Sequence, residues 1–244
     1  MLYGLIDSAF PVAAAMAVVA GIVRGFAGFG SAMLLVPSLS ALYGPQVAIP
    51  MLAAMELAVG GQLLPKAIKS AEPRTVGYLS AGALVGIPLG AVLLVLVPAE
   101  PMRWAISILI LVAVALLALG IGRKGPARRN GTIFTGGLSG LTTGATGMGG
   151  PPVVIYFLAG TDAAASIRAT LICFFIFTTV WQGAVYIANG LLTWEVAAKG
   201  ALLYPVFALG AVAGSRLFTG SKEQTYRRVA LALVAAVAVV SVLV

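Results

Sequence analysis

Apolar residues are gathered into long runs along this chain, and short polar stretches separate the runs. Six of the runs lie near 46–65, 75–97, 102–122, 166–188, 195–218 and 226–244. A helix needs about 20 apolar residues to cross the roughly 30 Å hydrocarbon core of a bilayer. The pattern therefore predicts six membrane-spanning helices.

Two further apolar stretches are interrupted and do not predict one regular helix each. The first covers about 8–44 with a break at 24–31, and the second covers about 132–161 with a break at 145–151. In the second, the 13 residues of 132–144 would give about 20 Å of helix, and the arm after the break is shorter. We therefore expect each arm to reach about halfway across the bilayer.

The two interrupted stretches share one glycine pattern, displaced by 119 residues. Gly21, Gly25, Gly28 and Gly30 match Gly140, Gly144, Gly147 and Gly149. Gly86, Gly90 and Arg103 likewise match Gly210, Gly214 and Arg227, and Gln62 matches Gln182. The sequence therefore predicts a single membrane transport domain over 1–244, with repeat 1 at about 1–122, a basic linker at about 123–131 and repeat 2 at about 132–244.

Basic residues in the loops distinguish two topologies, because Lys and Arg concentrate on the cytoplasmic side. If both interrupted stretches cross the membrane, making eight segments, the two sides carry eight and five basic residues. If both enter and return as re-entrant hairpins, the sides carry eleven and two. We therefore predict an all-α membrane protein of two inverted repeats, each a hairpin followed by three spans, with both termini outside.

Composition excludes most other classes of protein. The chain has 244 residues, of which 61% are hydrophobic and 9% charged, and its mean hydropathy is +1.07. A soluble domain of this size could not bury so much apolar surface. The net charge of +8 fits basic cytoplasmic loops and does not indicate nucleic-acid binding. The first apolar run lacks a basic preceding region and a small-residue cleavage site, so we expect it to be retained rather than removed as a signal peptide.

Catalytic and cofactor signatures are missing from the sequence. With one cysteine, Cys173, and no histidine, neither a disulfide framework nor a metal site is expected, and no cofactor is implied. No nucleophile elbow, HExxH motif, Walker loop or carboxylate pair is present. We therefore expect a transport protein rather than an enzyme.

The two glycine-rich breaks are candidate anion sites. Each precedes a new helix, and the free N–H groups at a helix start attract anions. The candidates are Gly25, Gly28, Gly30 and Ser31 in the first break, and Gly144, Thr146, Gly147, Gly149 and Gly150 in the second. Glycines at such spacings also serve close helix packing, which is the interpretation we adopt for Gly86, Gly90, Gly210 and Gly214.

Four polar side chains within the apolar sequence add to this chemistry. Arg24 lies in the first break, where a cation needs water, a counter-ion or a substrate, so it could contact an anion or pair with Glu56. Glu56 could instead carry a proton. Gln62 and Gln182, matched between the repeats, are candidate hydrogen-bond donors to the anion.

Three motifs carry a family resemblance: Gly25-Phe26-Ala27-Gly28-Phe29-Gly30 with Pro37 downstream, the glycine-rich stretch from Gly144 to Pro152, and Gly210-x-x-x-Gly214. On these motifs the whole chain resembles the sulfite exporter TauE/SafE family of bacterial membrane proteins. The resemblance implies export or import of sulfite, sulfoacetate or related organosulfonates across the bacterial inner membrane, driven by the proton-motive force.

Taken with the breaks, the resemblance predicts a secondary transporter of a small anion that works by alternating access, surrounded by membrane lipid. An anion channel is the alternative mechanism, because two half-helices meeting near the midplane also describe selective pores. The alternative substrate is a small anion without sulfur, such as a carboxylate.

Overall fold

Helices account for all regular secondary structure in the residues that the computed structural model describes, which are 7–27, 30–119, 127–158 and 163–219. These residues form nine α-helices and no strand. The helices are α1 (Phe10–Ala27), α2 (Ser31–Tyr43), α3 (Pro45–Ala67), α4 (Pro73–Leu96), α5 (Ala99–Ala118), α6 (Arg129–Thr146), α7 (Gly150–Leu158), α8 (Ala164–Ala188) and α9 (Trp194–Thr219). The predicted all-α class is confirmed.

The long apolar runs become single helices, and the predicted breaks become helix boundaries. Helices α3, α4, α5, α8 and α9 cover the first five predicted runs, while 226–244 lies outside the described residues. Proline opens α3 at Pro45 and α4 at Pro73, where its missing N–H costs no helical hydrogen bond. By length and composition, three of the described helices could cross a membrane: Pro73–Leu96, Ala165–Ala188 and Trp194–Leu217.

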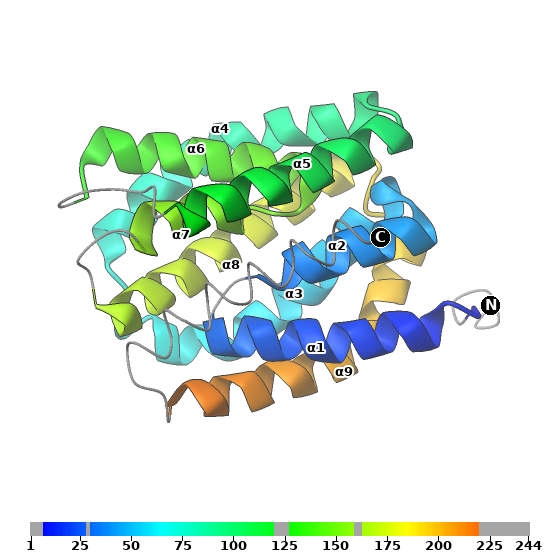
Figure 1. Cartoon of the computed structure of the whole chain (residues 1–244), viewed down its shortest axis with the longest axis horizontal. Helices are drawn as coiled ribbons and strands as arrows, with labels where there is room; N and C mark the ends of the chain where they lie inside the picture. The colour runs from blue at the N-terminus through cyan, green and yellow to red at the C-terminus, as the bar shows by residue number, and fades with distance from the viewer. Residues whose placement is uncertain (1–6, 28–29, 120–126, 159–162, 220–244) are drawn as a thin grey trace.

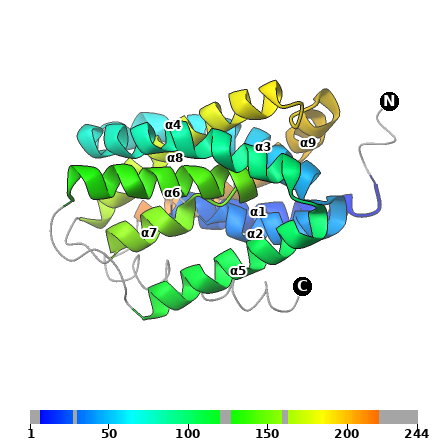
Figure 2. The same ribbon diagram turned by 90° about the horizontal axis from the view of Figure 1, so that it is seen from above.

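The chain reverses direction at both breaks. Figure 1 shows α1 and α2 running in opposite directions, and α6 and α7 doing the same; Figure 2 agrees. The first arms are longer than expected, since the 18 residues of α1 and of α6 each give about 27 Å of helix. These helices are thus longer than the 13-residue arm expected from sequence. Helix α6 also begins at Arg129, so the end of the predicted linker is helical.

Glycines bring helices of the two halves into close contact, α1 with α9 and α4 with α6, which are the most extensive helix contacts among the described residues. A Cβ added to Gly86 of α4 would lie 2.2 Å from the carbonyl oxygen of Gly137. One added to Gly214 of α9 would lie 2.0 Å from that of Ile22. The predicted packing role of Gly86, Gly90, Gly210 and Gly214 is confirmed, because backbones can approach so closely only without side chains.

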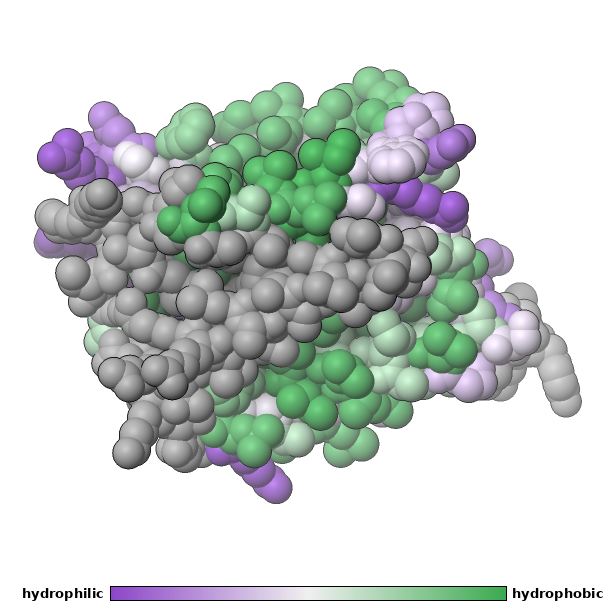
Figure 3. Space-filling view, in the orientation of Figure 1, coloured by the Kyte–Doolittle hydropathy of each residue, from purple (hydrophilic) through white to green (hydrophobic). Residues whose placement is uncertain are grey.

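The outer surface suits contact with lipid. Figure 3 shows an apolar band across the middle of the molecule, with hydrophilic side chains gathered at its two ends. Large apolar side chains lie exposed on this surface, among them Leu89, Leu96 and Val85 of α4.

One backbone carbonyl within α4 has its hydrogen-bond partner on another helix. Pro88 has no N–H to donate to the carbonyl of Leu84. Trp181 Nε1 of α8 donates to this carbonyl instead, at 3.2 Å, so the group is not left unpaired at membrane depth.

Substituting one contact glycine should destabilise the fold. In Gly86→Ala the new methyl group overlaps α6, so we expect a loss of about 1–3 kcal/mol of stability, measured as a lower melting temperature in detergent. Gly77→Ala in the same helix is the matched control, because its added Cβ meets nothing within 4 Å and alanine favours the helix. Equal melting temperatures for the two variants would contradict the packing role.

Candidate functional site

The two breaks meet at one cavity inside the helix bundle. The cavity has a volume of about 30 Å³, which is enough for a ligand of a few heavy atoms. Its lining comes from α1, α2 and α3 on one side and α6, α7 and α8 on the other. The lining residues are Arg24, Gly30, Ser31, Ala32, Glu56, Thr143, Gly147, Gly149, Gly150, Phe175, Thr178, Thr179 and Gln182.

The first residues of two helices line this cavity. Gly30 precedes α2 in a left-handed conformation (φ 95°), and no side-chain hydrogen bond caps that helix start. Gly147 ends α6 in the same region (φ 70°), and α7 then begins at Gly150. The unsatisfied N–H groups at a helix start, with about half a positive charge, favour an anion. At α2 these N–H groups begin at the cavity, whereas at α7 Pro151 and Pro152 carry none, so that among its first three residues only Gly150 offers one.

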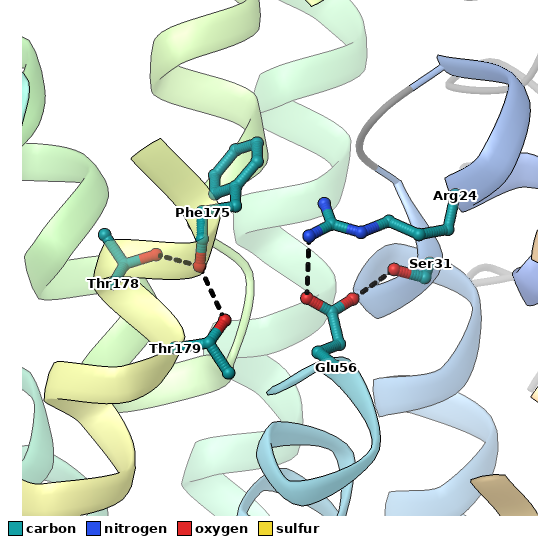
Figure 4. Close-up of polar contacts among 6 residues, drawn as sticks. All are labelled: Arg24, Ser31, Glu56, Phe175, Thr178 and Thr179. Carbon is teal, nitrogen blue, oxygen red and sulfur yellow. Dashed lines mark hydrogen bonds and ion pairs between the residues drawn. The ribbon is translucent and has the colours of Figure 1, made fainter. Parts of the chain in front are cut away.

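Arg24 and Glu56 form the charged part of the site. Arg24 lies in the last turn of α1, not inside the break as predicted, and its side chain is 2% exposed. Its Nη2 is 3.6 Å from Glu56 Oε2, and its guanidinium lies over the Phe175 ring at 5.3 Å (Figure 4). Ser31 donates a hydrogen bond to Glu56 Oε1. The pair joins α1, α2 and α3 at the cavity.

Gln182 lies opposite this pair and holds the end of α6. Its side-chain NH₂ group donates to the Thr143 carbonyl at 2.7 Å and to the Tyr186 hydroxyl at 2.9 Å. Tyr186 in turn donates to the Gly144 carbonyl at 2.7 Å. Side chains of α8 thus bond two carbonyl groups in the last turn of α6, of which Thr143 also accepts the N–H of Gly147.

Arg168 bonds carbonyl groups at the end of α1, as Gln182 and Tyr186 do at the end of α6. From α8, its Nε donates to the Phe26 carbonyl at 3.0 Å and its Nη2 to the Gly25 carbonyl at 2.5 Å. An arginine at a helix end more often extends its side chain to the membrane surface. Arg168 instead has defined partners close to Arg24 in the chain, at the negative end of the α1 dipole.

The predicted site residues divide into those that line the cavity and those that do not. Arg24, Gly30, Ser31, Glu56, Gly147, Gly149, Gly150 and Gln182 line it. Gly25 and Gly144 pack elsewhere: an added Cβ would meet the carbonyl oxygens of Ala211 and Ile87, at 1.9 and 2.2 Å. Gly28 and the Gln62 side chain lie outside the described residues.

Among the threonines, the structure places different residues at the cavity from the one favoured by sequence. Thr146 ends α6, where its hydroxyl donates to the Thr142 carbonyl at 2.8 Å, and it does not line the cavity. Thr143, Thr178 and Thr179 do. The repeat displacement of 119 residues indicates Thr143, which matches Arg24. No comparable sequence signal marks Thr178 or Thr179.

Comparison with known proteins agrees with the family motifs. The model of the family described as "Sulfite exporter TauE/SafE" matches residues 13–241. The chain belongs to the sulfite exporter TauE/SafE family. No curated protein and no solved structure matches it. Membership, together with the apolar helices, identifies a multi-pass membrane protein of the sulfite-exporter type.

Proposed function

We propose that this TauE/SafE protein is a secondary transporter of sulfite or a closely related small sulfur oxyanion across the bacterial inner membrane. The observation that carries the proposal is the meeting of two helix starts and the Arg24 guanidinium at one cavity between the two breaks. Each helix start contributes partial positive charge, and the Arg24–Glu56 pair is neutral. Arg168 bonds the carbonyl end of α1 and offsets the negative end of that dipole. The cavity favours a small anion.

We propose that the topology is an inverted repeat with six spans, two re-entrant hairpins and both termini outside. Alternating access would follow from such a repeat. The reciprocal contacts support it, since the first helix of each half packs against the third long helix of the other. The two glycine contacts lie on either side of the cavity, α1 with α9 and α4 with α6. We propose that these pairs move as units, opening the cavity first to one face and then to the other.

We propose that Glu56 couples transport to a proton. Its carboxylate oxygen Oε2 lies 3.6 Å from Arg24 Nη2, so an entering anion competes with Glu56 for the same guanidinium. When Glu56 accepts a proton, this competition ends and the repulsion between carboxylate and anion disappears. Anion and proton would therefore bind together, which lets a proton gradient drive the anion.

Uptake of labelled sulfite into proteoliposomes that hold the purified protein under an imposed pH gradient tests the function. We expect saturable uptake that unlabelled sulfite and organosulfonates reduce more strongly than chloride, with protein-free liposomes as the control. No flux of any anion would contradict the proposal. Non-saturating, voltage-driven current would identify a channel instead.

Replacing Arg24 should weaken anion binding. In Arg24→Gln the guanidinium charge is lost, and we expect sulfite affinity to fall about tenfold or more, measured as the half-saturation concentration of uptake. Since the single variant leaves Glu56 without its counter-ion, Arg24→Gln with Glu56→Gln provides a second test in a neutral background. Unchanged half-saturation in both variants would remove Arg24 from the site.

Replacing Glu56 should uncouple transport from protons. Glu56→Gln keeps a hydrogen-bond acceptor for Ser31 but cannot exchange a proton, so we expect uptake to lose its dependence on the pH gradient while sulfite–sulfite exchange continues. Exchange and gradient-driven uptake are measured in the same vesicles, which separates coupling from binding. A variant that still follows the pH gradient would exclude Glu56 as the proton carrier.

A further inference from the structure

Three threonine hydroxyls line the cavity opposite Arg24, and each has already given its hydrogen to the backbone. Thr178 Oγ1 lies 3.1 Å and Thr179 Oγ1 2.7 Å from the Phe175 carbonyl oxygen. Figure 4 draws both hydrogen bonds as dashed lines. Thr143 Oγ1 lies 2.7 Å from the Ser139 carbonyl oxygen. A carbonyl oxygen only accepts hydrogen bonds, so the hydroxyl must be the donor in all three. With these bonds in place, the hydroxyls offer a ligand their lone pairs.

Gln182 extends the same acceptor character. Its side chain is 4% exposed, and its NH₂ group donates to the Thr143 carbonyl and to Tyr186. Both amide hydrogens are thereby used, because Tyr186 donates its own hydrogen to the Gly144 carbonyl. What Gln182 retains for a ligand is its carbonyl oxygen. Four acceptor oxygens, three hydroxyl and one amide, therefore belong to the lining from α6 and α8.

The opposite side of the cavity has the reverse character. Arg24 carries only N–H donors, and the start of α2 presents backbone N–H groups without a side-chain cap. Donors therefore face the cavity from Arg24 and from the helix starts, whereas the threonine and glutamine oxygens of α6 and α8 face it as acceptors. The Glu56 carboxylate, which also lines the cavity, is engaged by Arg24 and Ser31. An anion whose outer atoms are all acceptors satisfies the first side but places lone pairs against lone pairs on the second.

We infer that the transported anion carries its own hydrogen-bond donor, and that Thr178 and Thr179 select for it. This inference rests on the proposed function. Its anionic oxygens face Arg24 and the helix starts, while its O–H or N–H group donates to the threonine and glutamine oxygens. Hydrogen sulfite is the smallest anion of sulfite type that meets this requirement and suits the small cavity. The sulfite dianion does not meet it.

Competition between matched anions tests the selection in the proteoliposome assay, in mildly acidic buffer where most sulfite is protonated. Hydrogen sulfite is compared with chlorate, which has three oxygens and one negative charge but no hydrogen. In a second arm, 2-hydroxyethanesulfonate is compared with propane-1-sulfonate, which replaces the hydroxyl with a methyl group. We expect the hydrogen-bearing member of each pair to compete about fivefold more strongly, the effect of one hydrogen bond.

The variants Thr178→Val and Thr179→Val keep the side-chain shape and remove the acceptor oxygen. We expect each to reduce competition by hydrogen sulfite about fivefold and to leave chlorate unchanged. Thr135→Val is the matched control, because Thr135 is also buried and bonded to its own helix, at the Gly131 carbonyl, but does not line the cavity.

Equal competition within both pairs, or equal effects of the valine variants on both anions, would overturn the inference. Anion transport itself would then stand, since sulfite uptake is still observed. If the unmodified protein took up no sulfite at all, the proposed function would be overturned instead. The two failures are therefore distinguishable within one assay.

Discussion

Two helices end inside this molecule, and the backbone groups at those ends must find partners at a depth where lipid offers none. Side chains of α8 bond carbonyl groups at both ends: Arg168 bonds the end of α1, and Gln182 with Tyr186 bonds the end of α6. The helices that follow begin at the cavity, and no side-chain hydrogen bond caps the start of α2. The interruption of the helices thus creates the site.

The same helix, α8, supplies both sets of carbonyl partners and four of the residues that line the cavity. Phe175, Thr178, Thr179 and Gln182 all belong to it. A shift of α8 relative to α1 or α6 would therefore change the support of a helix end and the shape of the cavity together. This coupling is what a transporter needs, since access and binding must change in one step.

The two halves use equivalent positions for different chemistry. Arg24 of the first half corresponds to Thr143 of the second, and Glu56, six residues before Gln62, corresponds to Ile176, six residues before Gln182. Arg24, Glu56 and Thr143 line the cavity. The glycine spacing is shared by both halves, whereas the charged pair occurs in one alone. One half therefore supplies the charge, and the other supplies neutral oxygens and an aromatic ring beneath the guanidinium.

The sequence by itself determined the helical class, the breaks and the duplication, because hydropathy, proline and glycine act locally through lipid and backbone geometry. It also indicated Arg24, Glu56 and Gln182 as polar groups that an apolar sequence retains for a reason. Only the tertiary structure decided that Gly25 and Gly144 serve packing while Gly30 and Gly149 line the cavity, since the glycine pattern is the same for both roles. It alone brought Thr178 and Thr179 opposite Arg24, and assigned Arg168 to the end of α1, because those contacts join residues more than a hundred positions apart. Such contacts depend on how whole helices pack, which no local pattern specifies.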